Sequence, residues 1–167
     1  MDRRQSKSGF WRGFGFAIDG ISYAIAWERN MKIHVGAAIL VLVVALIVRP
    51  PLPAVVISVL TMVVVMSLEL VNTAIERIVD AVAGEQRLEF AQIAKDTAAG
   101  AVLLGALASL AAGYYIVAST YPWQWRLTSG VHPAGAVISA LTLLVIVLLW
   151  VHSQVFHRKI RHGTAQY

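Results

Sequence analysis

The chain has 167 residues, of which 58% are hydrophobic and only 14% are charged, and its mean hydropathy is +0.69. This balance lies outside the range of ordinary soluble domains and predicts an integral membrane protein. The chain contains no cysteine, which excludes disulfides, thiol catalysis and zinc–thiolate sites. Its net charge of +5 is not expected to reflect nucleic-acid binding, because the basic residues lie at the ends of apolar segments.

The N-terminal segment, residues 9–32, mixes aromatic and apolar side chains with charged ones. This pattern predicts an amphipathic helix that lies on the membrane surface, with glycines loosening its start. A helix that merely anchors the chain is the simpler interpretation of the same periodicity.

Four long apolar segments follow, and we expect each to cross the bilayer as a helix. A spanning helix needs about 20 mostly apolar residues, and the predicted spans are residues 33–48, 52–76, 97–118 and 134–151. The sequence RPPLP, residues 49–53, must interrupt the helix because proline lacks an N–H donor. The expected fold is therefore all-α: a surface helix, a three-span core within residues 1–120, and a region 121–167 with a loop, a fourth span and a basic tail.

Lysine and arginine are unevenly divided among the loops. Most precede the first span, lie between the second and third, or follow the fourth, whereas the two remaining loops carry one arginine each, Arg49 and Arg126. Cytoplasmic loops carry the excess of basic residues, so we expect both termini in the cytoplasm. Four spans satisfy this rule in every region, whereas three would leave the basic tail outside.

Small residues recur at every fourth position of the third span, namely Ala101, Gly105, Ser109 and Gly113. Such a stripe lets helix backbones approach closely in lipid. It predicts tight packing, either within the helix bundle or between protomers.

A set of polar residues ends the second span. The stretch MSLELVNTAIERIVDA, residues 66–81, places Glu69, Asn72, Glu76 and Asp80 on one helical stripe, about 16 Å long. A charged residue at a helix centre in the bilayer costs about 2.5 to 3.5 kcal/mol, and Glu69 costs less because it lies near the end of its span. Intramembrane carboxylates commonly mark functional sites. The alternatives are a buried polar contact for Glu69 and a solvated position for Asp80.

The chemistry of this stripe suits phosphoryl transfer to a lipid. Carboxylate oxygens bind Mg²⁺ that is shared with substrate phosphates, and a carboxylate at the bilayer edge can accept a proton from a lipid hydroxyl. Lys95 and Asp96, just before the third span, add a cation that can neutralise phosphate charge. From spacing alone, a transporter or proton-conducting stripe fits nearly as well. The chain lacks a P-loop and a protein-kinase signature, so any ATP site must be of another kind.

Two motifs, ELVNTAIERIVDAV at 69–82 and AKDTAAGAVLL at 94–104, resemble the prokaryotic diacylglycerol kinase/undecaprenol kinase family, and ERNMKIHV at 28–35 resembles its Gram-positive-type branch. The resemblance covers about residues 9–118. It implies a homotrimeric lipid kinase of the bacterial cytoplasmic membrane that transfers the γ-phosphoryl group of ATP to a lipid alcohol. The expected alcohol is undecaprenol, with diacylglycerol as the second choice.

The resemblance also implies roles for individual residues. Glu69 is expected to be the catalytic base, and Glu28 and Glu76 are the expected Mg²⁺ ligands. The expected ATP contacts are Glu28, Glu76, Lys95, Asp96, Glu85, Gln86, Arg87 and Phe16. The expected lipid contacts are Glu69, Asn72, Arg29, Asn30, Met31, Lys32 and Ile33. The fourth span and the basic tail lie outside the family's usual three-span core.

Overall fold

The computed structural model of the chain describes residues 3–84, 88–122, 124–126 and 132–161, so Glu85, Gln86 and Arg87 lie outside the described residues. Within the described part the structure is all-helical, with the helices α1 (Arg3–Trp27), α2 (Arg29–Val48), α3 (Leu52–Ala83), α4 (Glu89–Ser119) and α5 (Pro133–Arg161). The helices α2 to α5 are each long and apolar enough to cross a membrane. The predicted all-α membrane fold, with a fourth C-terminal span, is confirmed.

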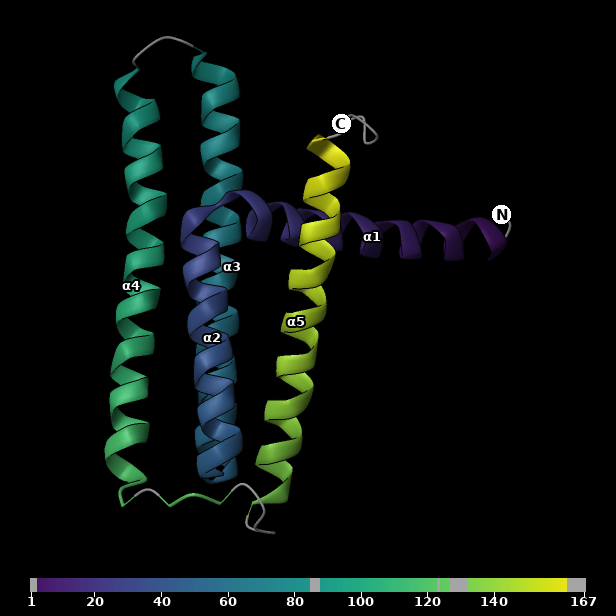
Figure 1. Cartoon of the computed structure of the whole chain (residues 1–167). Helices are drawn as coiled ribbons and strands as arrows, with labels where there is room; N and C mark the ends of the chain where they lie inside the picture. The colour runs from purple at the N-terminus through teal and green to yellow at the C-terminus, as the bar shows by residue number, and fades with distance from the viewer. Residues whose placement is uncertain (1–2, 85–87, 123, 127–131, 162–167) are drawn as a thin grey trace.

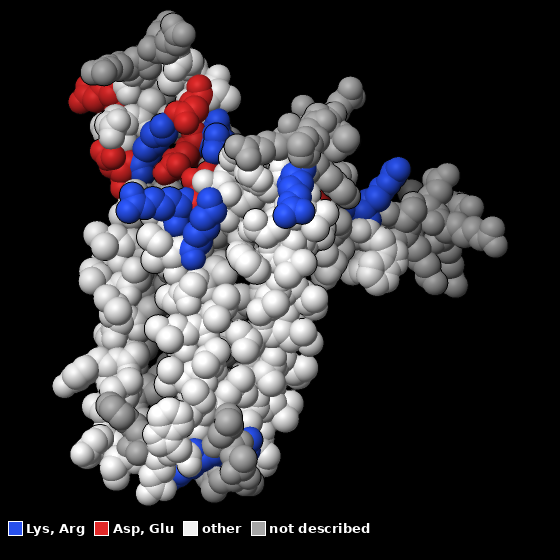
Figure 2. All heavy atoms as spheres, in the orientation of Figure 1, with Lys and Arg blue, Asp and Glu red and all other residues white. Residues whose placement is uncertain are grey.

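The four spanning helices run alongside one another, and α1 runs from the top of α2 past α3 and α5 and away from the bundle, nearer the end where α3 and α4 connect (Figure 1). Figure 2 shows that, on the face in view, acidic and basic residues gather at this same end. The middle of that face is free of charge, and only a few basic residues mark the opposite end (Figure 2). An apolar band between two polar ends is the surface that a bilayer requires.

The helix ends differ from the predicted ones. The surface helix stops at Trp27, because Glu28 has extended backbone angles (φ −85°, ψ 126°), and α2 already begins at Arg29. One extended residue lets the chain turn from the membrane surface into the bilayer. α4 begins at Glu89, and α5 continues to Arg161. Apolar composition marks only the part of a helix inside the hydrocarbon layer, whereas backbone hydrogen bonding continues into water.

A tight turn joins α2 to α3, as the prolines predict. Arg49 adopts the left-handed conformation (φ 52°, ψ 62°) and donates its backbone N–H to the carbonyl of Ala45, while Pro51 precedes the first residue of α3. The backbone N–H of Arg126 donates to the carbonyl of Ile47 at 2.9 Å, which fastens the α4–α5 loop to the end of α2.

The interior is shared unequally among the helices. Its hydrophobic cluster takes residues from α1, α2 and α5: Ala24, Ile25, Met31, Val35, Ala38, Leu42 and Ile146. Among the described helices, α4 packs only against α3. Small residues carry such contacts because lipid is as apolar as a protein core, which leaves close approach as the main source of attraction.

Gly105 brings α4 against α3. A Cβ atom placed on Gly105 would lie 2.7 Å from Cδ1 of Leu68, whereas one placed on Gly113 would meet nothing within 4 Å. The small-residue stripe therefore makes a close approach within the protomer at Gly105 and not at Gly113.

Replacing Gly105 by leucine is expected to lower the free energy of unfolding by about 1–3 kcal/mol, because the new side chain overlaps Leu68. Denaturation of the purified protein in detergent micelles measures this loss. Gly113→Leu is the matched control and should cost much less. Equal losses for both variants would contradict the packing of α4 on α3 described above.

Candidate functional site

Glu69 is buried close to one edge of the bilayer. α3 begins at Leu52, after the turn that we take as one edge of the hydrocarbon layer. Glu69 lies about 26 Å further along the helix, and the layer is about 30 Å thick, so Glu69 lies near the other edge. Its side chain is only 2% exposed. The side chain of Asn30, at the start of α2, hydrogen-bonds the carboxylate, but Oε2 has no hydrogen-bond partner among the described residues. A buried acceptor without a partner is costly, so the site has capacity for a hydroxyl from a ligand.

Two neighbouring side chains on α3 share this property. Oδ1 of Asn72 and Oγ1 of Thr73 are both buried and have no hydrogen-bond partner in the described structure. They follow Glu69 by three and four residues, so all three lie on one side of the helix. The amide nitrogen of Asn72 donates to Oε1 of Glu76 at 2.9 Å, which leaves the amide oxygen free to accept a hydrogen bond.

Asn72 and Thr73 each line a pocket beside α3, and the two pockets are separate because these residues project about 100° apart around the helix. Asn72 lines a pocket of about 410 Å³ between α3 and α4. Thr73 lines a larger pocket of about 920 Å³ between α1, α3 and α5, together with Phe16, Tyr23 and Arg77. Most of the larger pocket's other lining residues are apolar. This setting favours a lipid chain over a nucleotide next to Phe16.

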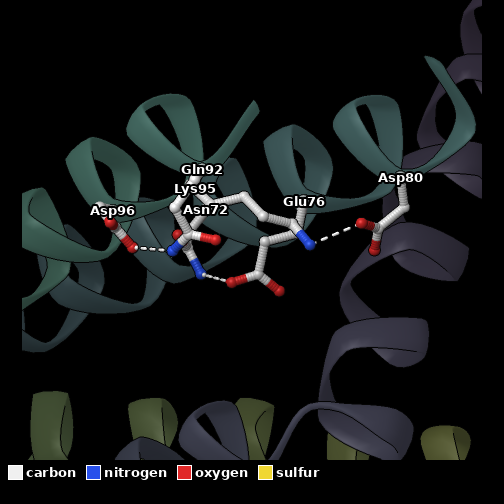
Figure 3. Close-up of polar contacts among 6 residues, drawn as sticks. All are labelled: Asn72, Glu76, Asp80, Gln92, Lys95 and Asp96. Carbon is white, nitrogen blue, oxygen red and sulfur yellow. Dashed lines mark hydrogen bonds and ion pairs between the residues drawn. The ribbon is translucent and has the colours of Figure 1, made fainter. Parts of the chain in front are cut away.

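A strip of polar side chains continues from Glu76 towards the α3–α4 loop (Figure 3). Nζ of Lys95 lies 2.5 Å from Oδ1 of Asp80, and Gln92 donates to Asp96 at 2.8 Å. The Lys95 and Asp80 side chains are 33% and 60% exposed. Exposed ion pairs of this kind contribute about 0–1 kcal/mol. The Lys95 ammonium can therefore exchange Asp80 for a phosphate at little cost.

Glu28 joins the site from the corner between α1 and α2. Its Oε1 accepts a hydrogen bond from Nη2 of Arg77 at 2.9 Å. The Arg77 guanidinium also lies over the ring of Tyr23, 5.3 Å from its centre. Glu28 and Glu76 both interact electrostatically with Glu69. The corner and α3 thus bring three glutamates into one acidic region.

The residues just after Glu28 face different surroundings. Asn30 reaches the Glu69 carboxylate, whereas Met31 is 1% exposed and packs inside the hydrophobic cluster. Arg29, Lys32 and Ile33 are exposed on the outside of α2. The structure therefore brings only part of this predicted lipid-contacting segment towards the acidic region.

Three residues at the site were not among the predicted ones: Thr73, Arg77 and Gln92. Gln92 precedes Asp96 by four residues, a spacing that favours a hydrogen bond on a helix and that could have identified it. Thr73 follows Glu69 by the same interval. Arg77 is paired with Glu28, 49 positions away, and no pattern within one helix indicates such a contact.

Glu28 and Glu76 suit a magnesium ion only in combination with a phosphate. Each uses Oε1 in a contact with the protein, to Arg77 and Asn72 respectively. No group of three or more acidic or histidine side chains in the described residues is arranged to hold a metal ion. Mg²⁺ is commonly bound by one or two carboxylates, with phosphate oxygens and water filling the other positions. The chemistry of two carboxylates is compatible with that donor set, and the assignment of Glu28 and Glu76 as Mg²⁺ ligands stays a prediction.

A family model described as prokaryotic diacylglycerol kinase matches residues 15–117. The chain belongs to this family. The membership confirms the resemblance inferred from the two motifs, and α5 lies wholly outside the matched prokaryotic diacylglycerol kinase region.

Two curated relatives are named as kinases of different lipid alcohols. The chain is 45% identical over 100 residues to a diacylglycerol kinase of Synechocystis sp.. The matched residues are 60% of this chain and 57% of the relative. The chain is also 36% identical over 115 residues to an undecaprenol kinase of Bacillus subtilis. These residues are 69% of this chain and 93% of that relative. The chain thus spans little more than half of the Synechocystis protein. No solved structure matches the chain.

Replacing Thr73 by valine is expected to raise the free energy of unfolding by roughly 1 kcal/mol, because it removes a buried hydroxyl that has no partner. Thr61→Val on the same helix is the control, since its hydroxyl already bonds to the carbonyls of Ile57 and Ser58. Denaturation in micelles compares the two variants. A loss of stability in Thr73→Val as large as that in Thr61→Val would show that the Thr73 hydroxyl is satisfied.

Proposed function

We propose that the protein is an ATP-dependent lipid kinase of the bacterial cytoplasmic membrane, which transfers the γ-phosphoryl group of ATP to a lipid alcohol. The observation that carries this proposal is the buried Glu69 carboxylate, with a free acceptor oxygen at the bilayer edge. A lipid hydroxyl can reach that level, and the weakly paired Lys95 lies nearby on the same polar strip as Glu76. The names of both curated relatives support the same reaction class.

Glu69 acts as the general base in this proposal. The lipid hydroxyl donates its proton to the carboxylate while its oxygen attacks the γ-phosphorus. The bond between the γ-phosphorus and the bridging oxygen breaks, which yields ADP and the lipid phosphate. Thr73 orients the hydroxyl oxygen in this proposal, because its buried Oγ1 has no partner in the described structure and can donate a hydrogen bond to it. Asn72 remains a proposed lipid contact. Arg29, Asn30, Met31, Lys32 and Ile33 remain proposed lipid contacts.

The ATP phosphates bind along the polar strip. Glu28 and Glu76 would hold Mg²⁺ together with phosphate oxygens, and the ion would supply charge neutralisation of the phosphates. Lys95 exchanges Asp80 for a phosphate oxygen, and Asp96 lies one residue further along α4. The loop residues Glu85, Gln86 and Arg87 remain proposed nucleotide contacts, whereas the apolar pocket beside Phe16 favours the lipid.

The assembly and orientation are part of the same proposal. We place both termini and the α3–α4 loop in the cytoplasm, where ATP is available, which agrees with the charged end seen in Figure 2. A homotrimer is supported by α4, which contacts only α3 among the described helices and leaves the rest of its surface to lipid or another protomer.

Glu69→Gln is expected to lower lipid phosphorylation by about 10²- to 10⁴-fold, the usual contribution of a general base. The fold should persist, because glutamine keeps the shape of the side chain. Labelled phosphate transfer and the melting temperature are measured on the same purified sample. Glu89→Gln, which changes an exposed glutamate at the start of α4, is the control. Near-normal transfer by Glu69→Gln would rule out its role as the base.

A panel of lipid alcohols tests the substrate. With γ-labelled ATP and Mg²⁺, we expect a higher kcat/KM for undecaprenol than for diacylglycerol, because the stretch 28–34, ERNMKIH, carries the Gram-positive-type pattern. The reverse ranking would assign diacylglycerol. Label in no lipid, combined with ATP-independent proton flux in liposomes, would favour the transporter interpretation, which has no support from the family match.

A further inference from the structure

α5 touches the part of α1 that leads into Glu28. The ring of His157 lies 4.5 Å from that of Trp27, the last residue of α1. One turn away, Nδ1 of His152 and Oγ of Ser22 form a hydrogen bond of 2.8 Å, and Ser22 is fully buried. Figure 1 shows α5 crossing α1 in this region, and α1 packs more extensively on α5 than on any other helix.

The contact continues from α1 to Glu28. The rings of Trp27 and Tyr23 are 6.4 Å apart, at the four-residue spacing that places side chains on one helix face. Arg77 lies over the Tyr23 ring and donates to Oε1 of Glu28 at 2.9 Å. We call His157, Trp27, Tyr23, Arg77 and Glu28 the brace. It links α5 to the acidic region through α1 and α3.

Glu28 needs such support because of where it lies. It is a single extended residue between two helices that run in different directions, so its position follows any movement of α1. The side chain of its ion-pair partner, Arg77, is 57% exposed. An exposed ion pair holds a side chain weakly when it acts alone. The aromatic face of Tyr23 adds a second contact to the guanidinium.

We propose that α5 positions Glu28 for the metal–nucleotide complex through the brace, and that His157 is a positioning residue at the α5 end of it. The inference rests on the proposed function, in which Glu28 is a ligand of nucleotide-bound Mg²⁺. Loss of the His157 ring should loosen the end of α1 and weaken binding of the metal–nucleotide complex. Turnover at saturating Mg–ATP and lipid should change little, because Glu69 is held on α3. Lipid binding should weaken less than nucleotide binding, because Tyr23 and Arg77 are two of many residues that line the pocket assigned to the lipid chain.

The test measures metal binding directly. Mn²⁺ is titrated, with its electron paramagnetic resonance signal as readout, into the full-length protein in micelles with a non-hydrolysable ATP analogue. His157→Ala is expected to weaken Mn²⁺ binding about threefold to tenfold, less than the 10- to 100-fold typical of residues that contact a metal ligand directly. His157→Phe keeps an aromatic ring and should restore the affinity. Val155→Ala, at an exposed position of α5, should leave it unchanged.

Kinetics separate positioning from general damage. His157→Ala should raise the apparent KM for Mg–ATP more than the KM for the lipid, while kcat at saturating substrates and the melting temperature stay near the wild-type values. An equal loss of lipid and Mg–ATP affinity, or Mn²⁺ binding by His157→Ala that equals the wild type, overturns the proposal.

An engineered disulfide provides a second, independent test of the brace. It also applies if His157→Ala alone folds poorly. The chain has no cysteine, so Ser22→Cys with His152→Cys introduces one pair at two side chains already in contact. Added to His157→Ala, the oxidised pair should tie α5 to α1 and restore Mn²⁺ affinity, and reduction should remove the gain. Failure of the oxidised pair to restore affinity contradicts the brace.

The same data distinguish this inference from the proposed function. A wild-type protein that phosphorylates lipid while all His157 variants bind Mn²⁺ equally overturns the brace alone. A wild-type protein that transfers no phosphate to any lipid, but whose Mn²⁺–nucleotide affinity depends on the His157 ring, overturns the proposed reaction and supports the brace. Absence of Mn²⁺–nucleotide binding by the wild type overturns both.

Discussion

The position of the Glu69 carboxylate constrains the rest of the structure. A carboxylate is tolerated in a membrane helix only near the edge of the hydrocarbon layer or inside the protein, and Glu69 satisfies both conditions. Asn30 reaches it because α2 begins at Arg29, at the same end of the bundle. The polar strip on α3 and α4 follows Glu69 along α3, from Asn72 and Glu76 to Asp80 and its partner Lys95 (Figure 3).

The interactions around the site differ in strength according to their burial. The lipid end of the proposed site consists of Glu69, Asn72 and Thr73, which are buried and keep unpaired oxygens at a cost in stability. The side chains proposed to bind ATP are more exposed. They form ion pairs, such as that of Lys95 with Asp80, whose attraction is reduced by the surrounding water. The proposed site thus combines a buried lipid end with an exposed nucleotide end.

The fold class and the polar stripe on α3 could be predicted from the sequence. Both depend on signals within one helix, namely the length of an apolar segment and the spacing of polar residues along it. The turn at RPPLP follows from the chemistry of proline alone. The extended residue at Glu28 was not predicted, because helix ends depend on where the chain must turn. Neither was the Arg77–Glu28 pair, which joins distant elements. The burial of Met31 was missed for the same reason, since the cluster around it is built by three helices.

In the proposed reaction, a lipid hydroxyl meets ATP at Glu69. The most direct measurement is photolabelling with a lipid alcohol that carries a diazirine next to its hydroxyl, in the presence of Mg²⁺ and a non-hydrolysable ATP analogue, followed by mass spectrometry of the labelled peptides. We expect adducts on residues 69–76 and 28–31, and we expect unlabelled lipid alcohol to reduce this labelling by competition. Labelling confined to the opposite end of the bundle, around residues 47–52, would contradict it.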